Sequence, residues 1–463
     1  MIEILPAIER FLESSQDPVL CEPGEEPLAI KSDNFVLEER HGCVQLQAWD
    51  QKRNLVRRVS AVEREMRGKL VLRVARFGKL AGTLDLIDRR RAVRDNVPLR
   101  SARLGFREQF RLFLRRQFPG YKLAELTTEA DLEHSLSPAY PRALLRQGAS
   151  AWAAIGVPSD SVRPDGVLTF GLIWLDYMRQ REPLLAIHGL ILYLPAGAEK
   201  TTCLRLSFLD PAAAQYRAFV YDEQGLEEKI DLTDYGNLDT HLEPYRRSLS
   251  QPMTASGVES IDRGDGELSY RVRGLEFART VGAEILMSMK PERAVELSRL
   301  RSPDAADRQH PLYIRNPEAW LESQVRAHVQ EVDASLLAAP IYGQVPAFAA
   351  ADRGVLDLLA IDTSGRLAVI ELKASEDVHL PLQALDYWMR VAWHVERRAF
   401  QTNGYFPGHE VVREPPRLLL VSPALDVHST NERVLRYFSP KIAVERLGVG
   451  LEWRKELKVM HRS

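Results

Sequence analysis

Residues 355–375 read VLDLLAIDTSGRLAVIELKAS, and this stretch decides the fold of the C-terminal part of the chain. The loop of Thr363, Ser364 and Gly365 has the length and the final glycine of a three-residue hairpin turn closed by a left-handed residue. The apolar segments on either side are rich in Val, Ile and Leu and have the length of strands. We therefore expect an antiparallel hairpin in which residues equally distant from Ser364 face each other.

Three charged residues interrupt these apolar strands. With that register, Asp357 and Glu371 are cross-strand neighbours with Cβ atoms about 5 Å apart. Lys373 follows Glu371 by two residues and shares its face, although a one-residue slip in register would undo this geometry. Two opposed, poorly hydrated carboxylates are costly unless something compensates. A divalent cation, Mg²⁺ or Mn²⁺, suits hard oxygen ligands, and a lysine beside it can orient or deprotonate a water and stabilise charge on a phosphate.

A purely structural interpretation of the hairpin stays open. In that interpretation Glu371 and Lys373 pair on a half-exposed sheet face, and Asp357 caps a loop. Short motifs of this kind match by chance. The surrounding residues must therefore decide between the two interpretations.

The order of residues beyond the hairpin favours a catalytic interpretation. An Asp, a hairpin, a Glu-x-Lys and then a helix that carries Gln resemble the PD-(D/E)XK, or restriction-endonuclease-like, nucleases. In this resemblance Asp357 takes the first acidic position, Glu371 the second and Lys373 the lysine. The segment LPLQALDYW supplies Gln383 and Tyr387, one helical turn apart. The chain departs from the pattern in lacking a proline before the first acid, as many members also do.

An expected helix upstream adds one more acid. NPEAWLESQVRAHV resembles the opening helix of the superfamily, and its Glu322 matches an acidic residue often found there, with ordinary surface charge as the alternative. The resemblance implies that Asp357, Glu371 and the main-chain carbonyl of Leu372 hold Mg²⁺ or Mn²⁺. The lysine would serve the attacking water, and hydrolysis of the phosphodiester would leave a 5′ phosphate and a 3′ hydroxyl.

The pattern of elements predicts a mixed α/β fold. The resemblance implies that residues 318–463 form a restriction-endonuclease-like core, with a central mixed sheet flanked by helices. A polar, proline-bearing stretch at 298–317 is the predicted linker. Before it we expect a β-rich N-terminal region at 1–100 and an α/β middle block at 101–297.

A short segment of the middle block is similar in sequence to a segment of the C-terminal block. WLDYMR at 174–179 resembles ALDYWMR at 384–390, and an apolar strand follows each helix. Where the second copy has VIELK, the strand WAAIGV offers no acid and no lysine. This similarity predicts that the middle block is a degenerate, non-cleaving copy of the nuclease fold, used for binding or dimer contact. Chance similarity between two amphipathic helices is the alternative.

Charge is distributed unevenly along the chain. Residues 52–122 contain 17 Arg and 4 Lys against 6 acidic residues, a net charge of +15 in a chain whose formal net charge is −2. Such a segment is the electrostatic footprint of phosphate-backbone binding, and pairing of these arginines with the chain's own acids is the alternative. The residues that we expect to contact nucleic acid are Arg57, Arg58, Arg73, Arg76, Tyr387 and Arg390.

Several function classes lack support in the sequence. No apolar run is long enough to span a membrane, and the N-terminal segment lacks the pattern of a signal peptide, so a cytoplasmic protein without membrane association is expected. Three widely separated cysteines argue against a disulfide framework and a cysteine zinc site. GKLAGT lacks the spacing of a phosphate-binding loop.

These features together predict an enzyme, a Mg²⁺- or Mn²⁺-dependent nuclease that acts on DNA as an endonuclease in repair or defence. A nucleic-acid-binding protein that has the nuclease fold but does not cut is the alternative. A nuclease that acts on RNA, or only with a partner protein, is a third interpretation. A homodimer is also open.

Overall fold

The computed structural model describes residues 4–22, 27–31, 34–40, 43–49, 54–66, 68–75, 81–89, 96–131, 133–161, 163–232, 238, 240–253, 257–282, 284–287, 291–346, 355–424 and 428–463. The chain divides into two compact units. Unit 1 comprises Met1–Phe113, Asp160–Pro164 and Arg308–Arg315, and unit 2 comprises the rest. The units do not coincide with the predicted domain boundaries, but helices and mixed sheets confirm the predicted mixed fold class.

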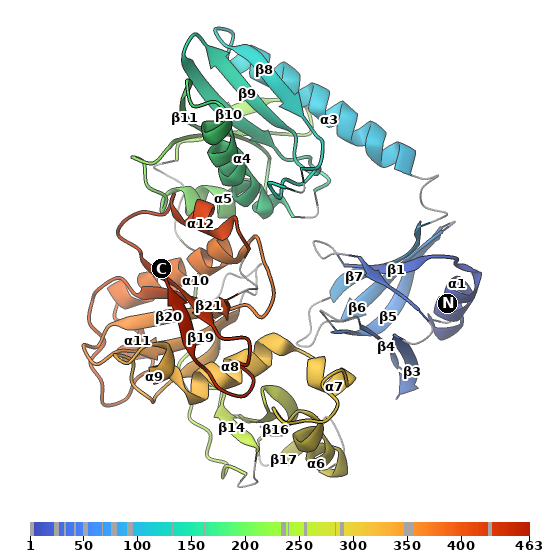
Figure 1. Ribbon diagram of the computed structural model, residues 1–463, viewed down its shortest axis with the longest axis vertical. Coiled ribbons are helices and arrows are strands. Elements are labelled where there is room, and N and C mark those ends of the chain that lie inside the picture. Colours follow the sequence, from blue (N-terminus) through green and yellow to red (C-terminus); the bar gives the residue numbers. More distant parts are fainter. Residues whose placement is uncertain are drawn as a thin grey trace. The chain divides into compact units, whose positions relative to one another are not determined.

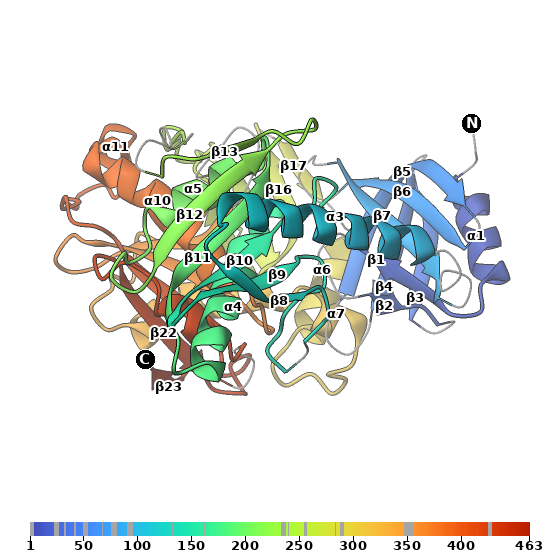
Figure 2. The same ribbon diagram turned by 90° about the horizontal axis from the view of Figure 1, so that it is seen from above.

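Unit 1 is built on an antiparallel sheet with strand order β2-β1-β7-β6-β5-β4-β3. Helix α1 (Ile4–Ser14) contacts β5 (Figure 2) and buries Ala7, Ile8 and Phe11. Strands with alternating apolar residues thus bury one face under an amphipathic helix. The strands are β1 (Pro18–Cys21), β2 (Leu28–Ala29), β3 (Phe35–Arg40), β4 (Cys43–Trp49), β5 (Asn54–Met66), β6 (Lys69–Ala75) and β7 (Ala81–Asp88).

The first sheet of unit 2 follows helix α3 (Asn96–Gln117) in the sequence. Its strand order is β13-β12-β11-β10-β9-β8; β10, β11 and β12 run parallel, and the remaining pairs are antiparallel. Helices α4 (Val167–Arg181) and α5 (Glu199–Leu206) make the two parallel crossovers. The strands are β8 (Lys122–Thr127), β9 (Arg142–Gln147), β10 (Ser150–Gly156), β11 (Ala186–Pro195), β12 (Gln215–Tyr221) and β13 (Glu227–Lys229).

The C-terminal sheet of unit 2 has the strand order β18-β19-β20-β21-β22-β23, and Figure 1 labels three of its strands, β19, β20 and β21. Strands β20, β21 and β22 run parallel, and helices α10 (Leu380–Glu396) and α12 (Asn431–Leu435) connect them. Helix α10 contacts β20 and β21, whereas α8 (Pro317–Ala327) contacts β19 and β20. The strands are β18 (Tyr342–Pro346), β19 (Val355–Ile361), β20 (Leu367–Leu372), β21 (Arg417–Pro423), β22 (Ala443–Val449) and β23 (Val459–Arg462), and the short helices are α9 (Val329–Val332) and α11 (Ala399–Thr402).

A third sheet of unit 2 is antiparallel and separate from the other two. It consists of β14 (Glu259–Asp262), β15 (Leu268–Val272), β16 (Leu275–Val281) and β17 (Glu284–Met287), and α6 (Pro291–Leu300) follows it. Residues 298–317, predicted as a linker, are packed in part: Arg301 is buried and donates hydrogen bonds to the carbonyls of Arg273 and Asn316. Helix α7 (Pro311–Ile314) also lies in this segment.

Within the described part of the chain, no helix is long and apolar enough to cross a membrane. One hydrophobic core is shared by the first and the C-terminal sheets of unit 2; it includes Trp174, Leu190, Leu359 and Leu385. Burial of this apolar area provides the main stabilisation of both sheets together.

Candidate active site

The hairpin of β19 and β20 has the predicted register. Leu358 pairs with Ile370, and the pairing continues symmetrically about Ser364 to the loop. Gly365 has φ +87°, and a Cβ there would lie 2.3 Å from the Glu410 carbonyl oxygen, so only glycine fits the turn. Asp362 Oδ1 closes the loop by accepting from Ser364 N at 2.9 Å and Arg366 N at 3.0 Å.

This register sets the half-buried carboxylate of Asp357 against the buried carboxylate of Glu371. Asp357 Oδ2 accepts a hydrogen bond from Leu372 N at 2.8 Å. Glu371 is 4% exposed, and its Oε2 has no hydrogen-bond partner among the described residues. Burial raises the pKa of Asp357 to about 7, and the negative charge of Glu322 adds to the rise. Burial, followed by the charge of Asp357, raises the pKa of Glu371 well above its usual range.

Lys373 lies in the same acidic cluster. Its Nζ is 3.6 Å from Glu318 Oε1 and 3.7 Å from Asp377 Oδ2. Burial lowers the pKa of Lys373, but the charges of Glu318, Asp377 and the two hairpin acids outweigh it and raise that pKa overall. Glu318 and Asp377 were missed by sequence reasoning. Glu318 precedes Glu322 by one helical turn and Asp377 follows Lys373 by four residues, and those spacings were the available signals.

Glu322 of α8 is held by arginines. It is buried; its Oε1 accepts from Arg326 Nη2 at 2.6 Å, and its Oε2 lies 3.6 Å from Arg271 Nη1. Gly343 of β18 makes room for this pair, because a Cβ there would lie 1.7 Å from Arg326 Nη2 and 2.9 Å from Glu322 Oε1. Glu322 is therefore close enough to influence Asp357 electrostatically, but its own oxygens are engaged in ion pairs.

Helix α10 brings Tyr387 to the acids. Burial raises the pKa of Tyr387, and the charges of Glu371 and Asp357 add to the rise. Gln383, one turn earlier, is half-buried in the same helix. Arg390 is 9% exposed and its Nη1 donates to the Asp386 carbonyl, so its side chain is placed in the interior and not on the surface where nucleic acid was expected to meet it.

The donor set fits a hard divalent cation. Asp357 and Glu371 offer opposed carboxylates, one oxygen of which lacks a partner, and the Leu372 carbonyl belongs to the same strand end. No group of three or more His, Cys, Asp or Glu placed to hold a metal occurs in the ranges described. A cation here would therefore complete its shell with waters and substrate oxygens, as Mg²⁺ commonly does.

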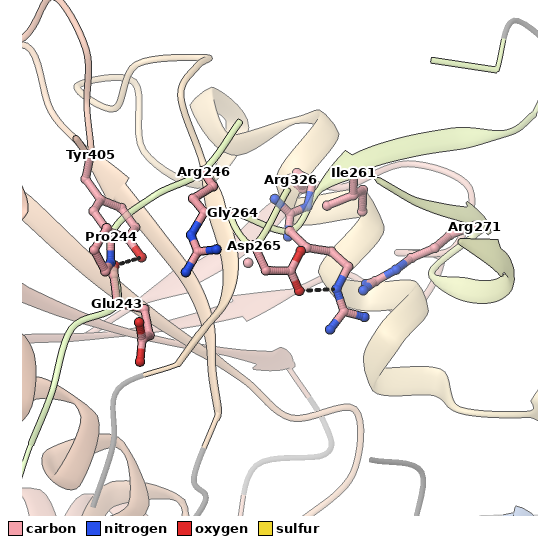
Figure 3. A pocket seen from close by; sticks show the side chains of 11 residues that line it. Glu243, Pro244, Arg246, Ile261, Gly264, Asp265, Arg271, Arg326 and Tyr405 are labelled. Atoms are coloured by element: carbon pink, nitrogen blue, oxygen red, sulfur yellow. Dashed lines mark hydrogen bonds and ion pairs between the residues drawn. The ribbon is translucent and has the colours of Figure 1, made fainter. Parts of the chain in front are cut away.

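A cavity of about 370 Å³ lies beside Glu322 (Figure 3). The two arginines that pair with Glu322 line it, and Arg246, Arg263, Asp265 and Glu243 add further charges. Arg263 Nε lies 3.2 Å from Asp265 Oδ2, and Figure 3 labels Asp265. Asp357 and Glu371 are not among the described residues of its lining. Sequence reasoning missed these arginines. The spacing of Arg326, four residues after Glu322 on one helix, was an available signal, whereas the other three come from segments far from that helix in the chain.

The arginines expected to bind nucleic acid in unit 1 have mixed surroundings. Arg57 forms an ion pair with Glu22, with Nε 2.5 Å from Oε1, and Arg73 Nε lies 2.7 Å from Glu63 Oε1. Arg58 is exposed. Arg76 lies outside the described residues. Two of the four thus match the alternative, internal pairing with acids of the same unit.

In comparisons with known proteins, no protein-family model and no curated protein sequence matches this chain.

Proposed function

We propose that the chain is a Mg²⁺- or Mn²⁺-dependent nuclease that hydrolyses phosphodiester bonds of DNA in the cytoplasm. The observation that carries the proposal is the opposition of the half-buried Asp357 to the buried Glu371, with an orphaned oxygen on Glu371 and with Lys373 in the same charge cluster. A protein that only needed a stable hairpin would lose stability by burying these acids. The resemblance to PD-(D/E)XK nucleases supports a role for this arrangement in metal binding for phosphodiester hydrolysis.

Each residue has a definable part in such a reaction. When bound, a divalent cation would supply positive charge to the scissile phosphate and lower the pKa of a water. Asp357, Glu371 and the Leu372 carbonyl would hold it. Lys373 would orient the attacking water by donating a hydrogen bond and would add positive charge beside the phosphate.

The cavity next to Glu322 supports a path for the substrate backbone. Four arginine side chains line it, and guanidinium groups bind phosphate oxygens in a bidentate manner. Neighbouring phosphates would bind there while the scissile one lies at the hairpin acids.

The decisive experiment compares wild type with Lys373→Ala on plasmid, single-stranded and branched DNA, in Mg²⁺, Mn²⁺ or EDTA. We expect metal-dependent cutting by wild type and a loss of roughly 10²-fold or more in the variant. Lys441→Ala, which removes an exposed lysine of the same unit, is the matched control and should cut as wild type does. Binding without cutting by wild type under all conditions would favour the silent nucleic-acid-binding protein.

A further inference from the structure

Two sheets of unit 2 share one topology. Each starts with an antiparallel three-stranded meander, continues through two helix-linked parallel strands and ends on an antiparallel edge strand. Strands β8 to β13 therefore correspond one by one to β18 to β23, α4 corresponds to α10, and α5 to α12. The resemblance of WLDYMR to ALDYWMR falls on the corresponding helices α4 and α10.

Hydrogen bonds align the two copies residue by residue. Lys373 N donates to the Val421 carbonyl at 3.0 Å, and in the first copy Val157 N donates to the Tyr193 carbonyl at 2.9 Å. Each donor directly follows the central strand, β20 or β10, so Val157 corresponds to Lys373. Two residues back along each central strand, Ile155 corresponds to Glu371.

The pairing across each hairpin gives the third correspondence. Ile155 pairs with Arg142 of β9, as the register of the other copy sets Glu371 against Asp357. Arg142, 1% exposed, donates to the main-chain carbonyls of Glu129, Ser137 and Tyr140. A buried cation of the protein itself thus occupies the place of the first acid, and the first copy has no donors for a metal at these positions.

The two copies meet through reciprocal contacts. Leu209, just after α5, forms an antiparallel bridge with Phe438, just after α12. Figure 1 labels these two helices. Around that pair Asp210 N donates to the Tyr437 carbonyl at 2.8 Å, and Ser439 N donates to the Phe208 carbonyl at 2.9 Å. Each bond runs from the residue after the bridge in one copy to the residue before the bridge in the other. Swapping the two copies therefore turns one bond into the other, as in a two-fold, isologous interface.

Ion pairs repeat that reciprocity. Arg205 of α5 donates to both oxygens of Asp386 in α10, at 2.8 and 2.7 Å. Arg433 of α12 has its Nε 3.7 Å from Asp176 Oδ2 in α4. The two aspartates occupy the same position of the shared LDY sequence, so each copy presents the same acid to an arginine of the other.

We propose that unit 2 is a dimer within one chain, in which the first copy is a non-catalytic partner and the protein therefore cuts one strand of a DNA duplex per encounter. This rests on the proposed nuclease function. A two-fold pair of identical copies presents one centre to each strand of a duplex, whereas this pair carries hydrolytic residues in one copy alone. The surface through which two such copies dock is already covered inside the chain.

Supercoiled plasmid tests the number of centres. With Mn²⁺ present, we expect nicked circles to be the first product and linear DNA to appear only after a lag, through a second independent event. Light scattering of the same protein should give the monomer mass of 52.5 kDa, with a cleavage rate proportional to protein concentration. Linear DNA that forms as fast as nicked circles, or a rate that rises with the square of the concentration, would overturn the proposal.

A second measurement does not depend on cutting. Reversing one charge with Arg205→Asp should lower the melting temperature by roughly 5 °C, because it buries two like charges at the interface. Adding Asp386→Arg should restore most of the loss. Lys229→Asp, an exposed reversal on β13, is the control. An unchanged melting temperature in Arg205→Asp would refute the built-in interface, whereas failure to cut any DNA, with this coupling intact, would refute only the nuclease proposal.

Discussion

Hairpins β9–β10 and β19–β20 occupy corresponding places in two sheets of one topology, yet they bury opposite charges. The first fills its site with the Arg142 guanidinium, which donates to three main-chain carbonyls. The second sets Asp357 against Glu371 and leaves one carboxylate oxygen without a partner. The buried Arg142 guanidinium finds acceptors within the protein for both of its Nη groups, although its Nε has none among the described residues, whereas an opposed acid pair needs a counter-charge. The fold therefore does not require an acid pair at this place in the sheet, and we attribute the acids of the second hairpin to the proposed chemistry.

The sharpest way to break this comparison is to mutate both sites. Asp357→Asn should reduce cleavage by roughly 10³-fold or more while the protein stays folded. Arg142→Met should instead destabilise the fold and leave cleavage by the folded protein unchanged. Because the change leaves three carbonyls without their donor, we expect a loss of roughly 3 kcal/mol in the free energy of unfolding. Two measurements check these expectations: the cleavage rate per folded molecule, and the free energy of unfolding from urea denaturation. A similar loss of specific activity in Arg142→Met would contradict the assignment of the first copy as silent.

The second test is the pH dependence of stability, which should come from the two acids of the β19–β20 hairpin. The folded pKa of Asp357, about 7, lies above its ordinary value of 3.8, so the folded state binds the proton more tightly. The resulting stabilisation is complete below about pH 4 and is lost as the pH rises through 7. Glu371, whose pKa is also raised, acts in the same direction. Urea unfolding in EDTA should show this decline.

Two controls sharpen that measurement. Asp357→Asn should flatten the decline between pH 4 and 7, and Mg²⁺ or Mn²⁺ should restore stability at the upper end by binding the folded state. A decline that persists unchanged in Asp357→Asn would assign it to other groups.

Arginines of the cavity and of the first copy should differ in their contribution to DNA binding, by a smaller amount. Arg246→Ala and Arg263→Ala, in the cavity beside Glu322, should each weaken DNA binding by roughly 3- to 10-fold and reduce the salt slope by about one. Arg146→Ala, on the exposed end of β9 in the first copy, is the matched control. Binding measured by fluorescence anisotropy across salt concentrations decides the matter, and equal effects at all three positions would remove the cavity from the substrate path.

The smallest expected difference lies in the turns of the hairpins. Gly365 has a positive φ and a Cβ there would meet the Glu410 carbonyl, whereas Gly148, also at positive φ, faces open space. Gly365→Ala should therefore cost roughly 2 kcal/mol of stability, and Gly148→Ala roughly 1 kcal/mol. Chemical denaturation of the two variants measures the difference. Equal losses would show that backbone conformation alone sets the cost.

Local features were predictable from the sequence, and features built from distant segments were not. The β19–β20 register followed from the glycine turn and the alternation of side chains, so the opposition of Asp357 and Glu371 could be foreseen. The ion pair of Glu322 with Arg326 was also open to prediction, because the two residues are four apart on one helix. Its pair with Arg271 was not, because Arg271 comes from a sheet with no periodic relation to α8. The shared topology was hidden for the same reason: strand order is set by pairing between segments, and only the LDY stretch kept a common sequence.

The contact of Leu209 with Phe438 joins segments of a single polypeptide, so it cannot be diluted apart. Association between separate subunits weakens as they become scarce, but here the tether holds the local concentration of each half constant. A harmful change on α5 would therefore act at any abundance of the protein, and a compensating change on α12 would be inherited with it.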